Sequence, residues 1–290
     1  MHLRNPEHQD IFYPSDPKTA GDLCDPRKSR KEDLPVNCLA ARLPAALMAP
    51  HAAWQWILPQ LRQAMATAAA LAPRQIVLLG PVHQQVILQD EPKIAFMPSQ
   101  DGAETPVGNM LFATASRDAL TTGFSKTIDI QDCYFTEEPC MEIFYPLLAA
   151  NFPQVPVLPI LASKECSSAQ CKNLAAILQA LFQKEPQTLF IVTANMSEET
   201  TRPRAREQAG NLQELLGQGH PLLEARTQGR INGCGLQWLE ALERLTWQSS
   251  GWMMLSCTND GENFYTEIPS QDITTDDKRH VVWHGVALHR

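Results

Sequence analysis

The 290-residue sequence lacks both a long hydrophobic run and an excess of basic residues. No segment reaches the roughly eighteen uninterrupted apolar residues of a membrane helix, and residues 1–7 lack the apolar core of a signal peptide. The formal net charge of −8 argues against a surface that binds nucleic acid or membranes, because either requires a basic face. We therefore expect a cytoplasmic protein whose partner is a small molecule or another protein.

The cysteines lack the paired spacing of a disulfide framework or a zinc finger. Cys166 and Cys171 lie five residues apart, which is not a C-x-x-C pair, and no second pair accompanies them. In a large chain without a signal peptide, such scatter is typical of reduced thiols. The eight positions are Cys24, Cys38, Cys133, Cys140, Cys166, Cys171, Cys234 and Cys257.

No change in composition and no Gly/Ser-rich linker divides the chain, so we expect a single domain over residues 1–290. Residues 1–42 are polar and rich in Pro, Asp, Lys and Arg, which predicts an extended N-terminal arm. The charged run over residues 27–33 is typical of a solvated loop. We expect the aromatic Phe12 and Tyr13 to attach this arm to the body of the protein.

Two segments repeat one pattern, an apolar strand that ends in a histidine. Residues 45–49 lead to His51, and residues 75–79 lead through Gly80-Pro81-Val82 to His83. The helical interval between them predicts a right-handed βαβ unit with parallel strands. Both histidines then lie at the carboxyl edge of the sheet, where open α/β sheets bind their ligands. Two imidazoles at that edge indicate a metal site or an acid/base pair.

Strand-like and helical patterns alternate along the rest of the chain, which predicts an α/β fold. We expect a mixed, largely parallel central sheet flanked by helices. Pro59 suits the first turn of the first helix, Pro156 and Pro159 indicate an edge strand or an interrupted ladder, and residues 198–206 are expected to be a loop. Further strands are expected at 86–88, 94–97, 127–130, 155–161, 188–193, 251–257 and 280–288, and helices at 61–72, 116–120, 141–150, 171–182, 207–216 and 235–245.

Cys234 lies between two glycines at the start of a predicted helix, where the helix dipole favours a thiolate. A thiolate and two neutral imidazoles form a three-ligand face that suits iron, copper or zinc. We therefore predict a metal site formed by His51, His83 and Cys234. Each residue alone also has an ordinary structural explanation, a hydrogen-bonded rim histidine or a small buried cysteine. Four other histidines, His220, His280, His284 and His289, are expected to be dispensable for metal.

Several short motifs, in order along nearly the whole chain, resemble those of the Memo-like family, also called AmmeMemoRadiSam system protein B. The matching segments are Phe12–Pro17 (family FYPADP), Pro50–Trp54 (PHAG-aromatic), Gly80–His83 (GPSH), Thr105–Gly108 (TPLG), Glu138–Glu142 (EHSxE) and Cys234-Gly235 (CG).

The resemblance implies a fold like that of the class III extradiol dioxygenases, which hold non-haem iron with two histidines and a carboxylate. Cys234 would here stand in for the carboxylate. It further implies a metal-dependent oxidoreductase acting on a small organic substrate, with iron as the first expectation and copper or zinc as alternatives. A radical-enzyme or AMMECR-type protein partner is also implied.

The chain departs from the family motifs at positions that could move protons. Pro139 stands in place of a histidine and Cys140 in place of a serine. In the segment that matches the family's SSDxSH, Asn195 replaces an aspartate and Glu198 a histidine, and an asparagine cannot act as a general base. The carboxylates that remain are Glu142 and Glu198, our predicted catalytic residues, with Glu137 and Glu138 as substitutes if they reach the site.

These observations leave three hypotheses open. The chain is a non-haem metalloenzyme, or it is a catalytically weakened paralogue that binds a metal or ligand and acts as a binding or interaction protein. In the third hypothesis, Cys140 joins His51, His83 and Cys234 in a closed, structural zinc site.

Overall fold

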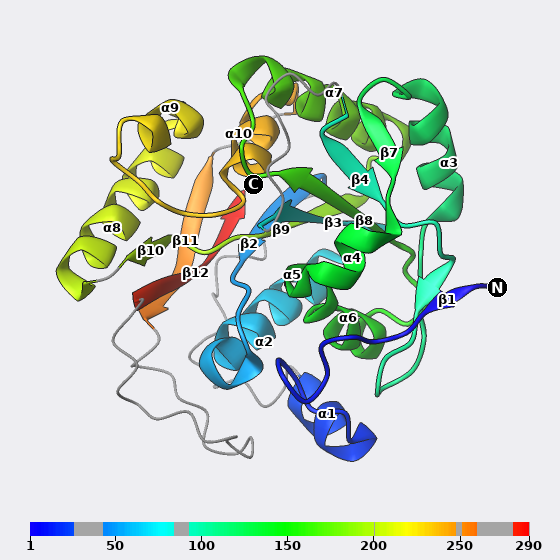
Figure 1. The fold of residues 1–290 in the computed structure, drawn as a ribbon. Coiled ribbons are helices and arrows are strands. Elements are labelled where there is room, and N and C mark those ends of the chain that lie inside the picture. The colour runs from blue at the N-terminus through cyan, green and yellow to red at the C-terminus, as the bar shows by residue number, and fades with distance from the viewer. Residues whose placement is uncertain (26–42, 84–92, 200, 248–250, 260–280, 290) are drawn as a thin grey trace.

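The computed structural model describes residues 1–25, 43–83, 93–199, 201–247, 251–259 and 281–289. A nine-stranded mixed sheet forms the centre of the molecule, and helices cover both of its faces (Figure 1). This confirms the predicted α/β fold class. Among the described residues, no helix combines the length and hydrophobicity needed to cross a membrane.

Four parallel strands form the middle of the sheet, in the order β2 (Ala45–Ala49), β9 (Thr188–Thr193), β3 (Gln75–Val82) and β8 (Val157–Ser163). Every residue of these strands is buried, as expected when helices cover both faces of a parallel sheet. Helix α2 (Trp54–Leu71) connects β2 to β3, which confirms the predicted βαβ unit. Strand β9 lies between the two, so β2 and β3 are near neighbours whose carboxyl ends share one edge.

The outer parts of the sheet are mixed. On one side, β4 (Ala95–Met97) pairs antiparallel with β8 and parallel with β7 (Ile128–Ile130). On the other side, β12 (Val281–His289) pairs antiparallel with β2, with β10 (Ser197–Glu199) and with β11 (Trp252–Asn259). A separate small sheet contains β1 (Leu3–Arg4), β5 (Gly102–Ala103) and β6 (Met110–Leu111).

Alternate residues of the central strands belong to two separate hydrophobic cores, because successive side chains of a strand point to opposite faces of the sheet. Leu47 and Leu78 lie in one core, and Met48 and Leu79 lie in the other. The first core is covered by α1 (Pro17–Cys24), α2, α4 (Asp132–Glu137), α5 (Pro139–Glu142) and α6 (Tyr145–Asn151). The second is covered by α3 (Thr114–Gly123), α7 (Ser168–Lys184), α8 (Arg202–Gln218), α9 (Leu222–Thr227) and α10 (Leu236–Glu243).

Two proline-containing segments differ from the prediction, and a third agrees with one of its two alternatives. The expected helix over residues 141–150 is divided into α5 and α6, because Pro146 has no N–H to donate to the carbonyl of Glu142. Pro59 lies inside α2 rather than in its first turn, since the helix already begins at Trp54. Of the two alternatives for Pro156 and Pro159, the structure shows the interrupted ladder: β8 is not an edge strand, but β4 pairs with it only at Leu161 and Ala162, so Pro159 is tolerated.

Residues 198–206 are not the single loop that was predicted, because Glu198 belongs to β10 and α8 already begins at Arg202. Three predicted features lie outside the described residues: the charged run 27–33, the strand 86–88 and His280.

Glu142 attaches the N-terminal segment to the body of the protein. It is buried at the end of α5, and its carboxylate contacts Arg4 Nη1 at 2.9 Å and the hydroxyl of Tyr13 at 2.9 Å. The backbone N–H groups of Glu7 and His8 donate to the same carboxylate. Burial and the negative charge of Glu142 raise the pKa of Tyr13, so the phenol keeps its proton and remains a donor. Tyr13 therefore has the attaching role that the sequence predicted.

We expect Glu142→Gln to destabilise the protein, because the substitution leaves the Arg4 guanidinium buried without its counter-charge. Removing one partner of a buried ion pair lowers the free energy of unfolding by about 3–5 kcal/mol, which urea denaturation measures. The matched control is Glu137→Gln, which changes an exposed carboxylate on the preceding helix. Equal stability of the Glu142 and Glu137 variants would contradict this assignment.

Candidate metal centre

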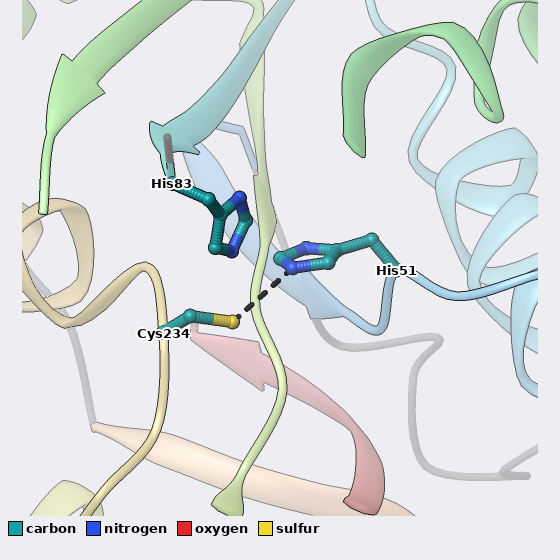
Figure 2. Close-up of side chains that lie close together, drawn as sticks. All are labelled: His51, His83 and Cys234. Atoms are coloured by element: carbon teal, nitrogen blue, oxygen red, sulfur yellow. Dashed lines mark hydrogen bonds between the residues drawn. The ribbon is translucent and has the colours of Figure 1, made fainter. Parts of the chain in front are cut away.

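Three donor side chains converge at the carboxyl edge of the sheet (Figure 2). His51 follows β2, His83 follows β3, and Cys234 precedes α10. One ligand atom from each lies within 4.8 Å of the other two, and His51 Nε2 is 3.2 Å from Cys234 Sγ. The two imidazole rings meet edge to face, with centroids 5.1 Å apart. The structure thus brings together the three residues that the sequence predicted as metal ligands.

Two glycines allow the Cys234 segment to approach the end of β9. At Gly235, where φ is +71°, a Cβ atom would lie 2.8 Å from the carbonyl oxygen of Thr193. At Gly233, a Cβ atom would lie 2.7 Å from the carbonyl oxygen of Asn195. The close approach permits two hydrogen bonds, from Cys234 N to Asn195 O (3.2 Å) and from Asn195 N to Cys234 Sγ (3.0 Å). The sulfur is therefore held by backbone groups.

Asn195 also holds the backbone of His51. Its side-chain Nδ2 donates to the carbonyl of His51 at 2.9 Å, and its Oδ1 accepts from the N–H of His51 at 3.2 Å. The sequence identifies Asn195 as the replacement of a family aspartate but does not show what its side chain contacts. In the structure, it connects the loops that carry two of the three donor side chains.

His83 is oriented by a buried carboxylate, Glu138. Only 1% of Glu138 is exposed; its carboxylate lies 2.8 Å from His83 Nδ1 and accepts a hydrogen bond from the backbone N–H of His83. This leaves Nε2 of His83 to face Cys234 and His51 (Figure 2). A histidine bonded through its second nitrogen to a carboxylate is a common arrangement among metal ligands.

Glu138 opens the segment that resembles the family EHSxE motif, whereas exposed Glu137 precedes that segment, but the sequence does not show which side chain Glu138 contacts. Its position depends on Gly80 of β3. A Cβ atom at residue 80 would lie 3.1 Å from Cys140 Sγ and 2.6 Å from Met141 Sδ. The absence of a side chain at Gly80 thus permits α5, and Glu138 just before it, to lie close to β3.

Contacts within the donor set shift the pKa values of Cys234 and His83 in opposite directions. Burial alone would raise the pKa of Cys234, but the charge and hydrogen bond of His51, together with those of His83, lower it to about 5. Burial alone would lower the pKa of His83, but hydrogen bonds to Cys234 and Glu138 raise it to about 10. Near neutral pH and without a metal, Cys234 is therefore a thiolate beside an imidazolium.

These residues fit a transition-metal ion. With metal–sulfur and metal–nitrogen bonds of ordinary length, a tetrahedral zinc site places sulfur and nitrogen about 3.5 Å apart. The separation between Cys234 Sγ and His51 Nε2 is a few tenths of an ångström shorter. One feature differs from well-supported sites, since Nδ1 of His51 is buried and has no hydrogen-bond partner among the described residues.

Cys140 forms a second set of neighbouring donors with His83 and Glu138, which shares His83 with the first set but does not include His51 or Cys234. Cys140 is buried, its Sγ donates to the carbonyl of Pro81 at 3.4 Å, and burial raises its pKa well above the usual range. A protonated thiol is a poor metal ligand. This geometry gives less support to the four-ligand zinc hypothesis than to the three-ligand site.

The two predicted catalytic carboxylates do not join either donor set among the described residues. Glu142 is bonded to the N-terminal segment, and Glu198 is an exposed residue of β10. Their catalytic roles stay predictions. Pro139, which replaces the family histidine, is the first residue of α5.

The comparison with protein-family models agrees with the motifs. The family model for Memo-like proteins matches residues 4–215, a range that includes His51, His83, Glu138 and Asn195 and ends before Cys234. The crystal structure of the uncharacterized protein JW3007 from Escherichia coli K12 is similar, with 13% sequence identity, a TM-score of 0.48, and coverage of 82% of this chain and 98% of that chain. A comparison with curated proteins gives no match. Since the family model covers most of its length, the chain belongs to the Memo-like protein family.

Proposed function

We propose that this Memo-like protein holds a transition-metal ion through His51, His83 and Cys234 and uses it in oxidative chemistry on a small organic substrate. The observation that carries the proposal is the convergence of three donor atoms within 4.8 Å, with His51 Nε2 only 3.2 Å from Cys234 Sγ. Two imidazoles and one thiolate suit iron, with copper or zinc as alternatives.

The residues around the donors support this role. Glu138 orients His83, the backbone N–H of Asn195 stabilises the negative sulfur of Cys234, and the Asn195 side chain holds the loop of His51. The side chain of His83 is 33% exposed, so the site is open to solvent on that side. A non-haem metal ion in a three-ligand site would supply an electrophilic or redox centre with room for substrate.

A second candidate function, binding of a metal or ligand without turnover, is favoured by Asn195. Both polar atoms of its side chain hold the backbone of His51, so the position of the family aspartate has a structural use here. Pro139 likewise cannot move a proton. In this alternative, the protein acts through its bound ion or through a protein partner, for which a radical-enzyme or AMMECR-type protein stays our expectation.

Metal analysis of protein purified without an affinity tag separates these functions. Iron with open coordination positions supports the oxidative enzyme, and copper bound without turnover supports the binding protein. Stoichiometric zinc held by four protein ligands would favour the structural site that includes Cys140. Anomalous scattering at the sheet edge identifies both the element and its ligands.

We expect His51→Ala and Cys234→Ser each to remove most of the bound metal and to leave the fold intact, because both residues lie in loops at the rim of the sheet. Metal content is measured by mass spectrometry, and the fold by circular dichroism. The matched controls are His220→Ala and Cys133→Ser, which change an exposed histidine and an exposed cysteine. Unchanged metal content in both rim variants would reject the assigned ligands.

We also expect metal affinity to depend on pH through His83. Between the pKa of Cys234, about 5, and that of His83, about 10, the sulfur is already ionised but His83 must lose a proton to bind metal. One proton released per ion makes the affinity rise by about tenfold per pH unit over this range. Below a pH of about 5, protonation of Cys234 steepens the dependence.

The measurement is a competition titration with Zn²⁺ at several pH values between the two pKa values. Glu138→Gln removes the carboxylate that stabilises the imidazolium of His83. The pH at which metal affinity stops rising should therefore be lower in this variant. Affinity that is independent of pH in the unmodified protein would show that His83 does not carry the displaced proton.

A further inference from the structure

A third histidine lies next to the donor set without belonging to it. His284 is on β12, its side chain is fully buried at 0% exposure, and its Nδ1 is 3.1 Å from Oδ1 of Asn195. From the sequence, His284 was expected to be dispensable for metal, with the other histidines outside the site. Its contact with Asn195 means that it is not an independent control. It also lies outside the range of the family match, which ends at residue 215.

The hydrogen bonds of Asn195 determine where His284 carries its proton. The amide nitrogen of Asn195 faces the carbonyl of His51, and the amide oxygen faces the N–H of His51. Reversing the amide would set two donors and two acceptors against each other. The oxygen must therefore also face His284, and Nδ1 of His284 must be the donor.

The backbone brings His284 to this position. Met196, the residue after Asn195, donates its N–H to the carbonyl of Trp283 at 2.8 Å, and Ser197 pairs with Trp283 in the sheet. Gly285 permits the close approach, since a Cβ atom there would lie 2.4 Å from Met196 Sδ. The contact between His284 and Asn195 is thus built between two chain segments that are already joined by backbone hydrogen bonds.

We propose that His284 is a positioning residue for the metal centre and acts through Asn195. His284 donates a hydrogen bond to Oδ1 of Asn195 and so helps to fix the orientation of the side-chain amide, whose other two hydrogen bonds are to the backbone of His51. The backbone of Asn195 both donates to Cys234 Sγ and accepts from Cys234 N. The proposal rests on the proposed function, because the geometry that it maintains is that of the ligands His51 and Cys234.

The same contacts explain why asparagine suits position 195 in this chain. An aspartate, the residue of the family motif, would place a carboxylate oxygen against the carbonyl oxygen of His51, where Asn195 Nδ2 now donates at 2.9 Å. Two acceptors at that distance repel each other. Asparagine suits this position because its amide supplies both a donor to the carbonyl of His51 and an acceptor for His284.

The test uses Co²⁺ as the probe, because its absorption bands report ligand geometry as well as binding. His284→Leu removes the donor, whereas His284→Asn retains an N–H near the position of Nδ1. We expect the Leu variant to bind Co²⁺ at least about tenfold more weakly with altered absorption bands, and the Asn variant to restore both. The control, His289→Leu, removes a buried histidine of the same strand that pairs with Glu243, and it should lower only the thermal stability.

A readout without metal separates this proposal from the proposed function. Loss of His284 should change the alkylation rate of Cys234 by iodoacetamide in the metal-free protein, since the N–H of Asn195 contacts the sulfur. If the unmodified protein binds no Co²⁺ but this rate changes in the Leu variant and recovers in the Asn variant, the metal function fails and the positioning role stands. If the Leu variant equals the unmodified protein in Co²⁺ affinity, absorption bands and alkylation rate, or if Asn rescues none of them, His284 has no positioning role.

Discussion

The double hydrogen bond between Asn195 and Cys234 is the constraint on which the candidate site depends. Cys234 belongs to a loop that precedes α10, and Asn195 follows β9. Two hydrogen bonds join them, one from Cys234 N to Asn195 O and one from Asn195 N to Cys234 Sγ. The contact is possible only because Gly233 and Gly235 have no Cβ atoms to collide with the end of β9. The N–H of Asn195 bonds to the sulfur, and the backbone bond holds the residue that carries it, so Cys234 Sγ lies 3.2 Å from His51 Nε2.

The charged side chains of this site stabilise one another through hydrogen bonds and opposite charges. Buried Glu138 supports the positive form of His83, and His83 with His51 supports the negative form of Cys234. Without a metal, this arrangement satisfies groups that would otherwise be costly to bury. In the proposed function, a metal ion would replace the proton of His83 and interact with the same thiolate.

Helix α5 connects this site to the N-terminal segment. Glu138, at its N-cap position, bonds to His83, and Glu142, its last residue, bonds to Arg4 and Tyr13. One short helix therefore carries two buried carboxylates that bind different parts of the chain. The division of the predicted longer helix at Pro146 leaves α5 short and allows it to lie over Gly80. In this placement, Glu142 anchors the N-terminal segment, and its catalytic role stays a prediction.

The sequence alone determined the fold class, the βαβ unit and which three side chains, His51, His83 and Cys234, converge at the sheet edge. Strand and helix periodicity are local properties, and parallel strands joined by a helix must bring His51 and His83 to one edge. Only the tertiary structure decided that Glu138 rather than Glu137 reaches His83, that the side chain of Asn195 holds the backbone of His51, and that His284 contacts Asn195. These contacts join residues 55 to 144 positions apart. No local pattern encodes such pairs, because they arise from glycine contacts and strand register that exist only after the chain has folded.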